Sequence, residues 1–330
     1  MSWLKALPFL LWLTALLLVG WVLSQLPLQS ILETIGTLSP LQWWVWVGLN
    51  LSIIGLATQR WKTLVSLLDL RVSFVTLLVI RQAGQAVSFL TPGPQFGGEP
   101  LQVFWLYTRS KLPLHSALLA LGLDRFYELW INFGVLVLAV LLLMASPAAE
   151  AGRWQNILLI LILLMLLLSG LGWLILKRPE QVLSWLKKVT RYWHQHPRLQ
   201  SIQTHWQRLG HDLQYAFKDK QSPLFMAFAL SVLGWIGLIG ELGLLLSFLD
   251  LTLDFSGFML ILVALRLAFL LPLPGGIGSL EAALFWAFQS LNLPVEAALN
   301  VIALMRLRDA LVLLAGLCCL RLLQTREQQA

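Results

Sequence analysis

Eleven charged side chains lie inside strongly apolar stretches of this 330-residue chain. An ionised side chain costs at least about 2.5–3.5 kcal/mol at the centre of a membrane helix on insertion scales, so such residues indicate a functional site or mutual pairing. Five of them are basic and six are acidic, which predicts pairing and a chemistry of ion recognition. They are Arg81, Arg125, Arg266, Arg306, Arg308, Glu99, Asp124, Glu128, Glu241, Glu281 and Asp309.

Two of the carboxylates, Glu99 and Glu281, each end a stretch rich in proline and glycine. The first break covers residues 92–99 (PGPQFGGE), and the second break covers residues 272–281 (PLPGGIGSLE). Proline stops a helix, and non-helical backbone at membrane depth must be buried in protein or line a polar cavity. Two interrupted segments in matching places of two halves indicate a transporter site at a repeat interface.

The similarity between the two breaks continues downstream. The next membrane-depth arginine follows the glutamate after 26 residues in one case and 25 in the other, and a carboxylate follows each arginine three residues later. That spacing puts each arginine and its carboxylate on one helix face. We predict an internal duplication within a single transmembrane domain of residues 1–330, with repeat 1 at about 41–145 and repeat 2 at about 223–323. The matched sets are Glu99, Arg125, Glu128 and Glu281, Arg306, Asp309.

The glycines of the two breaks suggest an anion site. Backbone N–H groups at the start of a helix are unpaired, the helix dipole is positive there, and glycine lets a phosphate approach closely. Arginine offers a planar fork that suits phosphate. The alternative is that the arginines form buried bridges that pin each hairpin to the next helix. The predicted head-group residues are Gly97, Gly98, Glu99, Arg125, Glu128, Gly275, Gly276, Gly278, Glu281, Arg306 and Asp309, with Arg81, Arg266 and Glu241 in a secondary role.

Composition indicates a polytopic membrane protein, because 58% of residues are hydrophobic and only 12% are charged, against about 25% charged in soluble domains. The net charge of +7 does not indicate nucleic acid, since no nucleic-acid-binding motif occurs. We find no P-loop, GxSxG, HExxH or comparable catalytic pattern. No catalytic residue, cofactor or metal ligand is therefore predicted, and an intrinsic enzyme is the least favoured reading.

The distribution of basic residues predicts the topology. Apolar runs long enough to cross a bilayer occur at about 6–26, 41–59, 114–145, 155–177, 223–249 and 294–323. If both broken segments return to their own side as re-entrant helical hairpins, 17 of the 23 lysines and arginines are cytoplasmic and one is outside, as the positive-inside rule requires. The expected fold is all-α, with about six transmembrane helices, two re-entrant hairpins in an inverted repeat, and both termini cytoplasmic.

Residues 179–220 form the one sizeable polar region. Apolar and tryptophan residues recur there every three to four positions, with basic residues between them. This pattern is typical of amphipathic helices on an anionic membrane surface. An ordinary solvated connector is the alternative.

At the two breaks the chain resembles the lysylphosphatidylglycerol synthase transmembrane region, the flippase-like module of the bacterial multiple peptide resistance factor. The matching residues are Arg81, Gly84, Pro92, Gly97, Gly98, Glu99, Asp124, Arg125, Glu128, the whole second break, Arg306 and Asp309. The resemblance implies a protein of a bacterial-type inner membrane that moves or presents phospholipids. In the best-known members a separate soluble domain carries the transferase chemistry, whereas this chain stops at Ala330; we therefore do not expect transferase activity.

The leading hypothesis is a lipid translocator that handles an anionic or zwitterionic phospholipid head group, such as phosphatidylglycerol or its aminoacylated form, between the two hairpins. One alternative is a membrane scaffold or partner of a lipid-modifying transferase, either lysyltransferase-like or a glycosyltransferase, with no catalysis of its own. Another is a small-anion or proton-coupled transporter. A bound phospholipid and the membrane itself are the expected partners.

Overall fold

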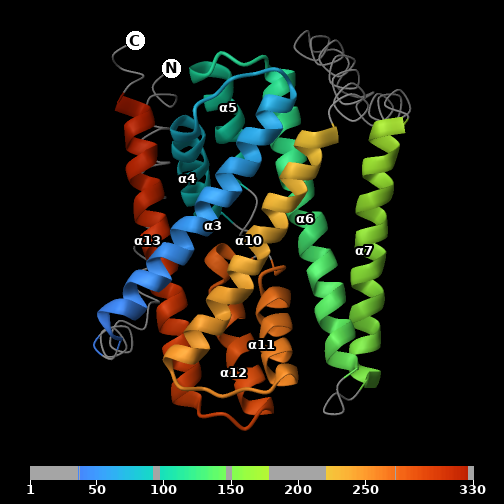
Figure 1. Ribbon diagram of the computed structural model, residues 1–330, viewed down its shortest axis with the longest axis vertical. Helices are drawn as coiled ribbons and strands as arrows, with labels where there is room; N and C mark the ends of the chain where they lie inside the picture. Colours follow the sequence, from blue (N-terminus) through green and yellow to red (C-terminus); the bar gives the residue numbers. More distant parts are fainter. Residues whose placement is uncertain are drawn as a thin grey trace, which may run out of the picture. The chain divides into compact units, whose positions relative to one another are not determined.

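Long apolar runs fold into α-helices, because a helix satisfies its own backbone hydrogen bonds where lipid cannot. The structure is a computed structural model, and it describes residues 36, 38–91, 97–145, 151–177, 221–271 and 273–325 (Figure 1). Within these ranges it contains nine α-helices, one short 3₁₀ turn and no strand. The predicted all-α polytopic membrane class is therefore confirmed.

Four helices are long and apolar enough to cross a membrane, and they match four of the predicted spans. The one clear difference is at the predicted span 41–59, where the helix runs eight residues further, to Leu67. Arg60 was expected beyond the span, but it pairs with the buried Asp124 and stays helical. The four helices are α3 (Pro40–Leu67), α6 (Leu114–Met144), α7 (Ala151–Lys177) and α10 (Gln221–Phe248).

Each predicted broken segment contains two short helices. In the first, α4 (Phe74–Leu90) precedes the break and α5 (Glu99–Arg109) follows it. In the second, α11 (Phe255–Ala268) and α12 (Ser279–Ser290) flank a 3₁₀ turn, η2 (Pro274–Gly276). The predicted last span is α13 (Val295–Thr325), a single helix of 31 residues. Whether the short helices re-enter the bilayer stays a prediction.

Helix bounds recur along the chain at a nearly constant offset. Helices α3 and α10 both have 28 residues and begin at positions 40 and 221, which differ by 181. Helices α6 and α13 both have 31 residues and begin at positions 114 and 295, which again differ by 181. Even the left-handed residues that follow α3 and α10, Asp69 and Asp250, keep this offset. The recurrence supports our proposal of two copies, whose inverted orientation remains a prediction.

The chain folds into two compact units. Unit 1 comprises Met1–Asn50, Val79–Pro100 and Ile239–Ala330. Unit 2 comprises Leu51–Leu78 and Leu101–Leu238. Both breaks belong to unit 1, which makes this unit the one that matters for the predicted site.

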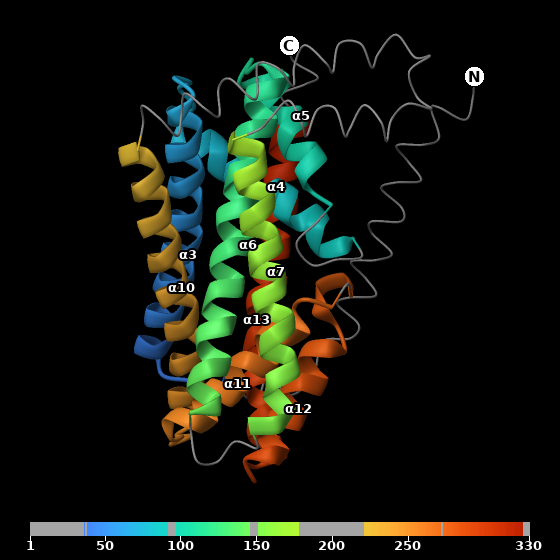
Figure 2. The same ribbon diagram turned by 90° about the vertical axis from the view of Figure 1, so that its right-hand side faces the viewer.

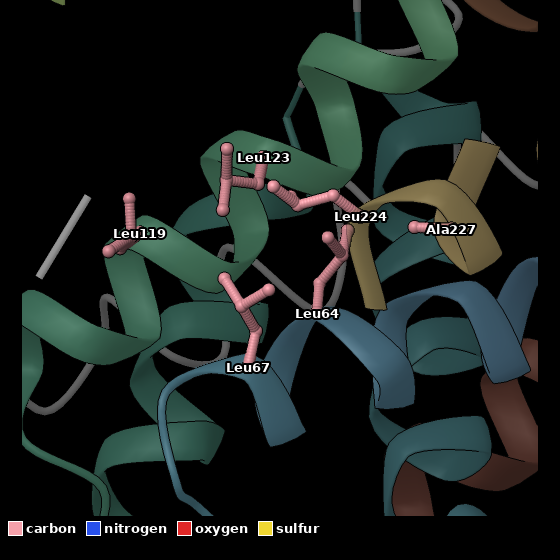
Figure 3. Close-up of a cluster of buried hydrophobic side chains, with 6 residues drawn as sticks. All are labelled: Leu64, Leu67, Leu119, Leu123, Leu224 and Ala227. Atoms are coloured by element: carbon pink, nitrogen blue, oxygen red, sulfur yellow. The ribbon is translucent and has the colours of Figure 1, made fainter. Parts of the chain in front are cut away.

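In unit 2, leucines from three helices form a buried cluster that holds α3, α6 and α10 together. Figure 3 shows Leu64 and Leu67 of α3, Leu119 and Leu123 of α6, and Leu224 and Ala227 of α10 pointing toward one another. Helix α7 packs along α6, and the Trp130 indole N–H donates to the Ser169 hydroxyl at 2.9 Å.

In unit 1, α12 packs against both α11 and α13. Helix α4 crosses α13 closely at Gly316, where a Cβ atom would lie 2.5 Å from the carbonyl oxygen of Gln82. Buried Ala86 and Leu313 pack beside this crossing. Figure 2 shows the end of α4 next to the turn between α11 and α12. The packing thus brings the first broken segment to the second.

Several predicted features lie outside the described residues. They are the span at 6–26, the prolines Pro92, Pro94 and Pro272, the polar region 179–220 and both termini.

Candidate functional site

The predicted site residues are concentrated in one unit. All of them lie in unit 1 except Arg125 and Glu128, which lie in unit 2. The predicted pairing of Glu99 with Arg125 stays a prediction. The contacts inside each unit define two charged networks.

The second break is held by one arginine, Arg306 of α13, whose side chain is 5% exposed. Its Nε donates to Glu281 Oε1 at 2.7 Å, and its two terminal nitrogens donate to the carbonyl oxygens of Gly275 and Gly276 at 2.8 and 3.1 Å. Further contacts reach Asp309 at 3.2 Å and Glu281 at 2.6 Å. All three nitrogens of the guanidinium are therefore engaged, by the loop carbonyl groups and by Glu281 and Asp309.

Glu281 links this clamp to the start of α12. Its Oε1 faces Arg306, while its Oε2 accepts the backbone N–H of Gly278 at 2.8 Å. Gly278 has a φ of 85°, which favours glycine, and it precedes the first residue of α12. The carboxylate therefore lies where the positive end of the helix dipole stabilises a negative charge.

The first break repeats this arrangement. Glu99 Oε2 accepts the backbone N–H of Gly97 at 2.6 Å. The N–H of Gly98 donates to the Ser88 hydroxyl at 2.9 Å, and a Cβ on Gly98 would lie only 1.9 Å from the carbonyl oxygen of Gly84. The start of α5 is thus pressed against α4, and only glycine fits there.

The two breaks approach each other through the last turn of α4. The Phe89 ring lies against Gly275, where a Cβ would come within 2.7 Å of the ring. Ser88, the preceding residue, holds Gly98. Consecutive residues of α4 therefore contact both breaks, as a shared site requires.

The donors at the breaks are bonded within the chain. The N–H groups of Gly97 and Gly278 donate to the carboxylates of Glu99 and Glu281, and the N–H of Gly98 donates to the Ser88 hydroxyl. Arg306 donates to carbonyl oxygens of the loop. That these residues contact a lipid head group stays a prediction. The alternative prediction, that Arg306 pins the hairpin, fits this geometry.

The clamp continues into a chain of ion pairs. Asp309 Oδ2 bonds to Arg306, and its Oδ1 accepts from Arg308 at 2.9 and 3.2 Å. Arg308 Nη1 reaches Glu241 Oε2 of α10 at 2.7 Å. The network therefore runs without interruption from the second break to α10. Arg266 of α11 lies within electrostatic range of Arg308 and Glu241.

Unit 2 holds a separate network around Arg60 of α3. Its Nε donates to Asp124 Oδ1 at 2.7 Å, and a terminal nitrogen reaches Glu128 Oε2 at 3.3 Å. Glu128 also pairs with Arg125 at 2.9 Å, which confirms the predicted i, i+3 pair. Ser231 of α10 accepts a further bond from Arg60 at 3.4 Å. Two positive and two negative charges balance in this network.

Sequence reasoning missed Arg60, because it sits beyond the end of the predicted span. Its position differs from that of Glu241 by 181, the repeat offset. At this matched position, Arg60 joins α3 to α6, and Glu241 joins α10 to α13. The charge at the position is positive in the first case and negative in the second. Aligning the two halves at this offset would have paired Arg60 with Glu241. Ser88 and Phe89 carry no comparable signal.

Among the described residues, no group of three or more histidine, cysteine, aspartate or glutamate side chains is placed to hold a metal ion. The chemistry that the arrangement offers is ionic recognition by carboxylates and guanidinium groups.

Known proteins resemble the chain over most of its length. The family model described as "Lysylphosphatidylglycerol synthase TM region" matches residues 7–316. A "UPF0104 membrane protein" of Methanothermobacter thermautotrophicus is 24% identical over 269 residues, covering 78% of each chain. No solved structure matches. The match over residues 7–316 includes both breaks and both arginine networks, and the chain therefore belongs to the lysylphosphatidylglycerol synthase TM region family.

Proposed function

We propose that this membrane protein translocates phospholipids and that the head group passes the two breaks of unit 1. The contact of α4 with both breaks carries the proposal: Ser88 bonds to Gly98, and Phe89 packs on Gly275. Irregular backbone at membrane depth is buried in protein or lines a polar cavity. A polar cavity beside the breaks would admit a lipid head group while its acyl chains remain in the bilayer.

The charges at the breaks favour a head group that carries an ammonium. Each break has a carboxylate at the start of a short helix, and the Glu281 side chain is 26% exposed. The arginine beside it is buried and fully engaged. A ligand approaching the break therefore meets Glu99 and Glu281 before it meets Arg306. Aminoacylated phosphatidylglycerol and phosphatidylethanolamine both carry the required amine.

The phosphate of the same lipid needs a positive partner. Arg81 on α4 and Arg266 on α11 lie on the first arm of each broken segment, and both belong to unit 1. We propose that these arginines face the phosphate while the two glutamates face the amine.

Flipping in reconstituted vesicles tests this function. Phosphatidylethanolamine and phosphatidylglycerol with a fluorescent label on one acyl chain are compared, and a membrane-impermeant reagent quenches the label in the outer leaflet. We expect the fluorescence of inner-leaflet lipid to fall faster for the amine-bearing lipid. Glu281→Gln should slow it about tenfold, the effect of losing a charge-assisted contact worth about 1.4 kcal/mol.

Glu296→Gln is the matched control, because Glu296 is an exposed carboxylate in the first turn of α13. It should flip both lipids at the wild-type rate. If folded Glu281→Gln and Glu99→Gln proteins also flip at that rate, the breaks are not the path of the head group.

A further inference from the structure

Glu241 is a buried carboxylate of unit 1 to which the proposed path of the head group assigns no contact. It lies on α10, away from both breaks in the sequence, and is only 3% exposed. Its Oε2 bonds to Arg308 at 2.7 Å, but its buried Oε1 has no hydrogen-bond partner among the described residues. A buried carboxylate oxygen without a donor is costly, and ionisable groups at membrane depth are commonly parts of proton pathways.

The partner of Glu241 does not depend on it. Arg308 gives Glu241 a single nitrogen, while its Nε and its other terminal nitrogen both donate to Asp309 Oδ1. If Glu241 loses its charge, Arg308 keeps its pairing with Asp309. The position can therefore exist in two charge states without leaving a guanidinium unpaired.

The surrounding charges fix what a proton would change. Arg308 of α13 bonds to Glu241, Asp309 of α13 bonds to Arg308, and Arg266 of α11 lies within electrostatic range of Glu241. With Arg306 and Glu281 they make three positive and three negative charges. A proton added to Glu241 neutralises its carboxylate and leaves the network with one net positive charge.

That change is coupled to the lipid site by direct bonds. Asp309 bridges Arg308 to Arg306, and Arg306 holds the carbonyl oxygens of Gly275 and Gly276. A shift of Arg308 toward Asp309 thus acts on the residue that clamps the second break. By contrast, the matching position of repeat 1 holds Arg60, which cannot lose its proton in this environment.

We propose that Glu241 binds and releases a proton at Oε1 during each transport cycle and so couples lipid movement to a proton gradient. The proposal rests on the proposed function. Protonation adds positive charge beside the clamp and favours entry of the lipid phosphate. Loss of the proton restores the Glu241–Arg308 pair and favours its release.

Vesicles with an imposed pH gradient test the coupling. We expect wild-type flipping to change by up to about tenfold per pH unit, which is the change in proton concentration. Glu241→Gln should flip at one rate at every gradient, and Glu296→Gln should respond like the wild type. Gradient-independent flipping by the wild type overturns the coupling but leaves the translocator intact.

Infrared difference spectroscopy gives a readout that needs no lipid transport. Between high and low pH we expect a protonated-carboxyl band that is present in wild type and Glu296→Gln but absent in Glu241→Gln. An unchanged band in Glu241→Gln overturns the proposal. Should that variant fail to fold, Glu241→Asp replaces it, and the band should then shift in frequency. An unshifted band would mean that the protonated carboxyl group is not that of Glu241. If the wild type shows the band but flips no lipid, the translocator fails and the proton site stands.

Discussion

At the scale of single residues, charged side chains of the same chain pair with the backbone polar groups of the breaks. Glu99 and Glu281 each accept a glycine N–H at the start of a short helix. Arg306 takes up two glycine carbonyl groups that have left the helical hydrogen-bond pattern. The backbone groups of the breaks that these contacts engage are therefore satisfied within the chain, as irregular backbone at membrane depth would require.

The residue types at these positions could be predicted, but their partners could not. Proline, glycine and glutamate spacing identified both breaks, and the i, i+3 rule identified the pairs of Arg125 and Arg306. The sequence does not reveal that the Arg306 fork faces inward, because an arginine can bind a carbonyl oxygen or a phosphate equally well. That choice depends on the path of the loop in space.

The fork geometry of Arg306 gives the most specific residue-scale prediction. Arg306→Lys keeps the charge but offers three donors in place of five. At least one buried carbonyl should then lose its donor, at a cost of about 1–3 kcal/mol. Thermal unfolding in detergent should show a lower Tm. Arg321→Lys, on the exposed face of the same helix, should leave Tm unchanged. Equal Tm values for the two variants would contradict the claim that the Arg306 fork stabilises the second break.

At the scale of elements, periodicity and length identified most helices. The predicted spans at 114–145 and 223–249 match α6 and α10 within two residues at each end. The main error was at α3, where Arg60, just beyond the predicted end of the span, is buried and helical. A composition-based boundary stops at the first charged residue, whereas the helix continues because Asp124 supplies a partner.

The crossing of α4 and α13 depends on the absence of a side chain at Gly316. A methyl group there would lie 2.7 Å from the Ala86 Cβ. We expect Gly316→Ala to destabilise the protein by about 1–3 kcal/mol through overpacking, measured as a shift of Tm. In α6, Gly122 has no atom within 4 Å of the added carbon, so Gly122→Ala should be neutral or slightly stabilising. A neutral Gly316→Ala would mean that the two helices are not in close contact.

At the scale of the whole molecule, helices of equal length begin 181 residues apart, α3 with α10 and α6 with α13. Arg60 and Glu241 are separated by the same 181 residues. The two positions related by this offset carry opposite charges, and each is the centre of a buried ion-pair contact, Arg60 with Asp124 and Glu241 with Arg308. The family resemblance and the helical class follow from the sequence. The partners of Arg60 and Glu241 do not follow from the sequence, because Asp124 and Arg308 come from other helices.

The central claim is that both breaks surround the head group of a transported phospholipid. A phosphatidylethanolamine with a photoreactive group on its amine, cross-linked in membranes and mapped by mass spectrometry, tests it most directly. We predict adducts in both peptides 88–99 and 273–282. Helix α7, with leucines exposed along its length, reports background contact with lipid. Adducts on α7 without adducts at either break would contradict the claim.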